Sequence, residues 1–356
     1  VFIHFIAALN YMSMGDTSAA RVEARQVTDK LELYNSKYTE TKNAYRDDAF
    51  ARWLSGKLAE TEGGQVAFND AWIDYQRSIE VYETEYGKRY RTALPRLVIA
   101  DAKRVLEALG ADFAPELSQL ESKYPSVTFQ KASEVASQGE VVFIHLAGES
   151  PYKKDEFWSI YDNDPIYIDV HSKKGHGRLV VRGRRKLLFR VAFPEYVAKR
   201  PRIVRSQISI AGGGTANSEM MENITAIAIQ NLNDHMGRIK AKAITRAITK
   251  YIAAKVAQEG GKALAKKKGK VGAAGAALQL AGVAFQIGSA IAEEADKRSW
   301  ITLPAAVSVA RIYAPPGKQQ LQIALQSGNG VTMSKVTLPV EVQPGKTTFV
   351  AYRTFR

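Results

Sequence analysis

Apolar residues recur at helical spacing through the first 125 residues of the chain. One such stretch runs from Ala19 to Leu31, and another, from Tyr45 to Glu60, contains Trp53 and Leu58. Residues three or four positions apart share one face of a helix, so this region predicts a series of amphipathic helices.

Turn-forming pairs and small residues punctuate this helical pattern. A Gly-Asp pair and an Asn-Asp pair are of the types that favour tight turns, and an alanine after each pair would let two helices approach closely. We therefore expect helical hairpins with tight interhelical turns. The predicted turn and packing residues are Gly15, Asp16, Ala20, Asn69, Asp70 and Ala71.

After a polar stretch at residues 126–139, the pattern changes to short apolar runs bounded by Gly, Pro or Asn, which predict β-strands. A long helix is predicted for residues 218–258, and further strands follow residue 305. The predicted architecture is therefore α+β in three parts. Residues 1–125 form a helical repeat domain, residues 140–300 a basic α+β domain with the long helix and an apolar Gly/Ala helix, and residues 301–356 a small antiparallel β unit.

Charge is distributed unevenly along the 356 residues, whose formal net charge is +14. Residues 1–139 carry 17 Lys and Arg against 20 Asp and Glu, whereas residues 140–356 carry 33 against 16. Such an asymmetry indicates two regions that face different partners.

The basic charge is densest between residues 173 and 205, where twelve basic residues accompany one acid, Glu195. Such a density attracts polyanions through counterion release and long-range steering. A solvated basic face is the alternative interpretation. The candidate polyanion-binding residues are Lys173, Lys174, Arg178, Arg182, Arg184, Arg185 and Lys186.

Residues 271–292 contain no charge and are rich in Gly and Ala. The stretch is long enough to span a bilayer, but its small residues favour close helix packing. A buried helix, a contact with a second subunit and a membrane-associated helix all remain open. The residues of this predicted assembly helix are Gly272, Gly275, Gly282 and Gly288.

Sequence motifs for catalysis are absent: there is no Gly-x-Ser-x-Gly, no phosphate-binding loop and no His-Glu-x-x-His. The chain also has no cysteine, which excludes disulfides, thiol nucleophiles and cysteine-ligated metal sites. We therefore expect no catalytic activity, no cofactor and no metal site.

The N-terminal region resembles the tetratricopeptide repeat, although its spacing is degenerate. The residues that carry this resemblance are Ala8 to Tyr11, Gly15-Asp16, Ala19 to Arg25 and Asn69 to Tyr75. Together with three later segments, they resemble an uncharacterised family of bacterial lipoprotein-like envelope proteins with tetratricopeptide-type N-termini. The later segments are Arg190 to Tyr196, Lys242 to Tyr251 and Ala295 to Pro304. The resemblance implies export and outer-membrane anchoring, and it implies no chemistry.

These observations predict a non-catalytic periplasmic or outer-membrane-associated scaffold that assembles with other envelope proteins in an oligomer, with possible contact to a membrane or cell-wall surface. Because the chain begins at Val1 inside a helical pattern, we expect an export signal and an anchor upstream of Val1. The alternative is a protein that binds a polyanion, namely nucleic acid, lipopolysaccharide or a cell-wall polymer, through residues 173–205. Nucleic acid is the less favoured partner because no nucleic-acid-binding motif is present.

Overall fold

The computed structural model describes residues 2–37, 45–161, 166–172, 175–181, 187–265 and 294–355. The chain divides into two compact units. Unit 1 comprises residues 1–151, 198–231 and 300–356, and unit 2 comprises residues 152–197 and 232–299. Each unit is therefore built from segments that lie far apart in the sequence.

Unit 1 begins with a helical layer in which each helix packs on the next. At the start of α3, the Asp48 side chain accepts a hydrogen bond from the Ala51 amide at 2.8 Å and so caps the helix. A π-helical segment, η1, continues α4. The helices are α1 (Phe2–Ser13), α2 (Thr17–Lys37), α3 (Ala49–Glu62), α4 (Gln65–Val81), η1 (Tyr82–Tyr90), α5 (Arg96–Leu109), η2 (Ala111–Phe113), α6 (Ala114–Lys123) and α7 (Ala132–Val135).

Two four-stranded sheets complete unit 1, with strand orders β12-β1-β9-β8 and β11-β10-β6-β7. The strand pairs are antiparallel except for β1 and β12, which run parallel. The strands are β1 (Gly139–Ala147), β6 (Arg205–Ile210), β7 (Gly214–Asn217), β8 (Glu219–Glu222), β9 (Ala306–Ala314), β10 (Gly317–Gln326), β11 (Thr332–Val342) and β12 (Thr347–Thr354).

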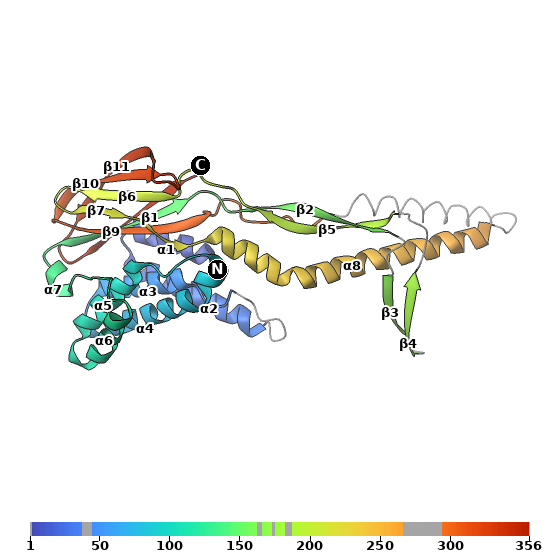
Figure 1. The fold of residues 1–356 in the computed structure, drawn as a ribbon, viewed down its shortest axis with the longest axis horizontal. Coiled ribbons are helices and arrows are strands. Elements are labelled where there is room, and N and C mark those ends of the chain that lie inside the picture. Colours follow the sequence, from blue (N-terminus) through green and yellow to red (C-terminus); the bar gives the residue numbers. More distant parts are fainter. Residues whose placement is uncertain are drawn as a thin grey trace. The chain divides into compact units, whose positions relative to one another are not determined.

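Strand β1 lies in the middle layer of unit 1 and is buried on both faces (Figure 1). Successive side chains of a strand point to opposite faces. Val142 and Ile144 pack in one core with the helices, whereas Val141 and Phe143 pack in a second core with the other sheet. Unit 1 is therefore a three-layer body of helices, sheet and sheet.

Unit 2 contains a ribbon of β2 (Tyr152–Tyr161) and β5 (Leu187–Val197), a hairpin of β3 (Ile166–Ser172) and β4 (Gly175–Val181), and most of α8 (Ile224–Ala265), which begins in unit 1. Among the described residues its core is small. The fully buried apolar members are Val191, Phe193, Ala243 and Ala247.

One predicted turn is wrong. Asn69 and Asp70 lie inside α4, and the turn before this helix is formed by Gly63 and Gly64. Both glycines have positive φ, at 73° and 87°, a conformation that Asn and Asp adopt less readily than glycine. The Gly-Gly break was visible in the sequence, and it outweighs the turn preference of the Asn-Asp pair.

The predicted boundary at residue 301 and the predicted start of the long helix at residue 218 also need correction. Residues 306–314 pair with β1, so the C-terminal strands share sheets with earlier strands and form no separate β unit. Residues 219–222 form β8, which pairs with β9, and α8 begins only at Ile224. Both errors concern pairing partners distant in sequence, which local patterns do not encode.

The coarse fold class is confirmed: the chain is a mixture of helices and mainly antiparallel sheets. The tetratricopeptide-like character of the helical layer stays a prediction. Within the described ranges, no helix is both long enough and apolar enough to cross a membrane.

A close contact between helices α3 and α4 of unit 1 gives a first prediction. A methyl group added at Gly56 of α3 would lie 2.8 Å from the ring of Tyr75, whose hydroxyl is fixed by a 2.7 Å hydrogen bond to Glu60. Gly56→Ala should therefore lower the free energy of unfolding by about 1–3 kcal/mol, the usual cost of overpacking, as measured by denaturant titration.

Gly237→Ala is the matched control, because a methyl group there meets nothing within 4 Å inside α8. It should be neutral or stabilising by about 0.5–1 kcal/mol. Equal effects of the two substitutions would show that Gly56 is not a packing constraint.

Candidate functional site

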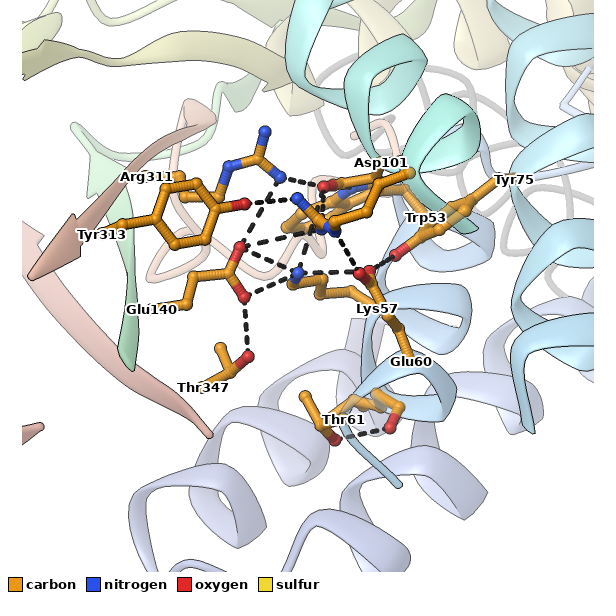
Figure 2. Close-up of polar contacts among 12 residues, drawn as sticks. Trp53, Lys57, Glu60, Thr61, Tyr75, Asp101, Glu140, Arg311, Tyr313 and Thr347 are labelled. Carbon is orange, nitrogen blue, oxygen red and sulfur yellow. Dashed lines mark hydrogen bonds and ion pairs between the residues drawn. The ribbon is translucent and has the colours of Figure 1, made fainter. Parts of the chain in front are cut away.

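Six charged side chains meet where the helical layer of unit 1 faces the sheet (Figure 2). We call this group the ion cluster. Its side chains are between 0 and 13% exposed. The members are Lys57 and Glu60 on α3, Asp101 and Arg104 on α5, Glu140 on β1 and Arg311 on β9.

Lys57 lies at the centre of the ion cluster. Its Nζ atom is 2.6 Å from Oε2 of Glu140 and 3.2 Å from Oε2 of Glu60. Glu140 also accepts a hydrogen bond from the Thr347 hydroxyl at 2.6 Å. Lys57 therefore links helix α3 to strand β1 through a buried charge pair.

The two arginines connect the same layers. Arg104 donates from Nε to Glu60 at 2.6 Å and from Nη2 to Asp101 at 2.6 Å. Arg311 of β9 donates to Asp101, which also accepts from the Trp53 indole at 2.9 Å. Asp101 therefore accepts hydrogen bonds from side chains of helices α3 and α5 and of strand β9.

The ion cluster is electrically balanced, since three cations face three carboxylates among the described residues. Burial alone would raise the pKa of Glu60, but the positive charges of Arg104 and Lys57 outweigh it and lower this pKa. Burial raises the pKa of the Tyr75 phenol well above its usual value. Neither group is therefore suited to exchange a proton near neutral pH.

A pocket of about 270 Å³ opens beside the ion cluster. Lys57, Glu60, Arg104 and Glu140 form part of its wall, together with Tyr313 of β9. Each of these charged groups already has an opposite charge within 3.2 Å. The wall therefore offers a ligand little uncompensated charge. Its ion pairs instead join the helical layer to the sheet. In the part of the chain that the structure describes, no group of His, Asp or Glu residues could hold a metal ion.

A second buried group, the tyrosine–carboxyl cluster, has a different character. The Tyr45 hydroxyl donates to Asp48 at 2.6 Å, and the Tyr82 hydroxyl donates to the Met221 carbonyl at 2.8 Å. The Tyr86 hydroxyl donates to Glu222 at 3.3 Å. The last two contacts join segment η1 to strand β8, directly before α8 begins, and the Ala49 amide at the start of α3 donates to the same Tyr86 hydroxyl at 3.2 Å.

The carboxyls of this cluster carry no matching cation among their described contacts. Burial, and then the negative charge of Asp48, raises the pKa of Glu222 well above its usual value. Burial also raises the pKa of Asp48, although hydrogen bonds from Tyr45 and the Ala51 amide oppose the change. Glu222 therefore tends to hold a proton in the folded protein.

Most of the sequence-predicted packing residues of the helical layer lie where a packing role requires. Gly15 has a φ of 79° in the turn between α1 and α2, and Asp16 accepts a hydrogen bond from the Ala19 amide at 2.9 Å. Ala20 and Ala71 are fully buried. The structure therefore places residues 15–16 in a turn and buries both alanines.

Asp70, placed inside α4 rather than in a turn, has another role. Its carboxylate is 2.5 Å from the guanidinium of Arg21 and 3.3 Å from that of Arg25, both on α2. Asn69 lies beside it on the same helix. Asp70 therefore connects α2 to α4 at the surface of the helical layer.

The predicted polyanion-binding residues lie mostly outside the described part of the chain. Arg178 falls within β4. The remaining candidates, Lys173, Lys174, Arg182, Arg184, Arg185 and Lys186, lie outside it, as do Gly272, Gly275, Gly282 and Gly288 of the predicted assembly helix.

Sequence reasoning missed both buried clusters. The ion cluster did leave a signal, because Asp101 and Arg104 interrupt the apolar pattern of α5 from Leu97 to Leu106. Charged residues inside a buried stretch indicate paired partners elsewhere. No comparable signal marked Glu222, whose neighbours resemble a helix.

Comparison of the chain with protein-family models, with curated proteins and with solved structures finds no significant match.

The raised pKa of Glu222 predicts a pH-dependent stability. Because the folded state holds this proton more tightly than the unfolded state, the stabilisation is present at acidic pH and is lost as pH rises through the folded pKa. Glu222→Gln keeps a neutral side chain at every pH. As pH rises from 5 to 8, the unfolding free energy of this variant should therefore increase relative to that of wild type by about 1–3 kcal/mol.

Glu60→Gln is a control of opposite sign, since the pKa of Glu60 is lowered in the folded state. Its stabilisation is present above the unfolded pKa and is lost as pH falls, so the substitution should be most harmful at neutral pH. A Glu222→Gln difference that does not change with pH would contradict the proton assignment.

Proposed function

We propose that this protein is a non-catalytic scaffold of the cell envelope, in which unit 1 is a rigid body and unit 2 is the part that meets partners. The observation that carries the proposal is the distribution of charge between the units. The sequence of unit 2 holds 23 Lys and Arg against 11 Asp and Glu, whereas that of unit 1 holds 27 against 25. Unit 2 thus has a net charge of +12, against +2 for unit 1.

The surface chemistry of unit 2 supports a docking role. Large apolar side chains are exposed beside cations: Phe157 is 45% exposed with Arg190 4.6 Å from its ring, and Trp158 is 41% exposed with Lys240 3.9 Å from its ring. Aromatic residues and arginine are enriched at protein interfaces. Such pairs at a basic surface favour an acidic partner.

The character of the ion cluster supports the non-catalytic part of the proposal. It consists of opposite charges that satisfy one another. Catalytic sites commonly hold groups whose pKa lies near the working pH, and the lowered pKa of Glu60 is of the opposite kind. A unit whose helical layer and sheet are joined by paired buried charges is suited to act as a rigid scaffold.

The compartment and the assembly rest on the sequence resemblance. We propose a periplasmic location with outer-membrane anchoring, tetratricopeptide-like helices in unit 1 and an oligomeric assembly with other envelope proteins. A second candidate function, polyanion binding through residues 173–205, is favoured by the same net charge, because residues 173–197 of this stretch belong to unit 2.

Site-specific photocrosslinking in cells tests the proposal. A benzophenone amino acid in place of Phe157 should form adducts with a small number of proteins of discrete mass, because that ring lies on the basic unit. The matched control is Phe355, which is 59% exposed on unit 1 beside Arg353. Adducts of equal number and intensity at both positions, or none at position 157, would contradict a docking role for unit 2.

A further inference from the structure

Strand β12 lies at the edge of its sheet, where it pairs with β1. Two backbone hydrogen bonds show which of its groups face β1. The Glu140 amide donates to the Lys346 carbonyl, and the Gly148 amide donates to the Thr354 carbonyl, both at 2.9 Å. In a parallel ladder, alternate residues turn their N–H and C=O toward the neighbouring strand. The even-numbered residues of β12 therefore face β1, and the odd-numbered residues turn their backbone groups outward.

The open edge of β12 is formed by the backbone of four residues. No other group in the described part of the chain forms a hydrogen bond with these amides and carbonyls. Both faces of the strand are already in use, because Phe349 packs against the core beneath the helices and Val350 packs between the two sheets. The four residues with an outward backbone are Thr347, Phe349, Ala351 and Arg353.

The other three edges of the two four-stranded sheets carry features that oppose strand addition. Strands β7 and β8 are four residues long, and β11 contains Pro339 as well as the charged Lys335 and Glu341. Short length, proline and charge are the means by which natural sheets prevent edge-to-edge pairing. Strand β12 has eight residues, no proline and one charge, Arg353, and its β-branched and aromatic residues favour strand pairing. It is therefore the edge at which unit 1 can accept another strand.

The outward residues of β12 are complementary to those of a second copy. Strands related by a two-fold axis perpendicular to the sheet run antiparallel, and one register pairs all four outward residues. Phe349 then lies opposite Ala351 of the other copy, a large side chain against a small one. Thr347 lies opposite Arg353 of the other copy, so no like charges face each other directly. Any other register leaves at least one outward residue without a partner within the strand.

We propose that two copies of this chain associate by antiparallel pairing of their β12 strands, so that the two β12-β1-β9-β8 sheets become one continuous sheet. The two-fold axis passes beside Val350. Such a pair is closed, because it uses the open edge of both copies. The net charge of unit 1 is only +2, so electrostatic repulsion between two copies of this unit is small. The inference goes beyond the proposed function, since it concerns unit 1 and does not depend on docking by unit 2.

Sedimentation equilibrium of the full chain tests the inference. Wild type at about 100 μM should have twice the mass of one chain, which is 39.2 kDa. Ala351→Lys places a cation in the middle of the edge of both copies, and it should raise the dissociation constant of the dimer by about tenfold or more. A wild type that stays monomeric, or a dimer that Ala351→Lys does not weaken, would overturn the proposal.

Met333→Lys is the matched control, because it adds the same charge at a side chain that is 50% exposed on the edge strand β11. This variant should keep the dissociation constant within about threefold of wild type, since its position lies outside the proposed contact. Circular dichroism and thermal unfolding check that both variants remain folded. An equal loss of association in the two variants would show that net charge, and not the edge of β12, controls the association.

A single cysteine tests the register, because the chain has no cysteine of its own. In the proposed register Val350 faces Val350 of the other copy as a non-hydrogen-bonded pair, whose Cα atoms lie about 4.5 Å apart, within the range of a disulfide. Val350→Cys should therefore form a covalent dimer on mild oxidation. Tyr352→Cys is the control on the same face: its Cα atoms would lie about 13 Å apart, too far for a disulfide. Equal crosslinking of both variants, or none of Val350→Cys, would overturn the pairing.

The result can be separated from that of the proposed function. Adducts at position 157 report on unit 2, whereas an adduct at position 355 with the mass of two chains reports on this pairing, because Phe355 directly follows β12. A monomeric wild type that forms adducts at position 157 would defeat the inference alone. A β12-dependent dimer without adducts at position 157 would defeat the docking role of unit 2 alone.

Discussion

The structure of unit 1 depends on the electrical balance of its ion cluster. Three cations and three carboxylates are removed from water between the helical layer and the sheet, and each depends on an opposite charge from another element. Desolvation makes one uncompensated charge in this position very unfavourable. The cluster therefore favours the single arrangement of α3, α5, β1 and β9 in which all six charges are paired.

The tyrosine–carboxyl cluster also buries acidic groups, but a bound proton takes the place of a neighbouring cation. Asp48 and Glu222 are both fully buried, and their described contacts include tyrosine hydroxyls but no cation. Protonation of Glu222 removes its electrostatic repulsion with Asp48. The stability of β8 therefore depends on pH. Since α8 begins two residues after Glu222, this joint lies directly before the start of that helix. Unit 1 is thus fixed by charge balance, whereas the larger part of the net charge belongs to unit 2.

The sequence predicts those parts of the fold that depend on residues close together in the chain. Helical spacing located the helices of the first 125 residues, and short apolar runs located strands after residue 139 and after residue 305, because burial on one face imposes a period. Strand β8 was read as helix, and the C-terminal strands were assigned to a unit of their own, since their partners lie far away in the sequence. The ion cluster was missed for the same reason: Lys57 and Glu140 are 83 residues apart. Only the charged residues within α5 hinted at it.

A double-mutant cycle on Lys57 and Glu140 tests the electrical balance most directly. Lys57→Met leaves the cluster with one excess negative charge and Glu140→Gln leaves one excess positive charge, so each should cost about 3–5 kcal/mol of unfolding free energy. The double substitution restores neutrality. The account predicts that it costs less than the sum of the two single changes by about 0.5–3 kcal/mol. Strictly additive costs would contradict the claim that charge balance holds the helices to the sheet.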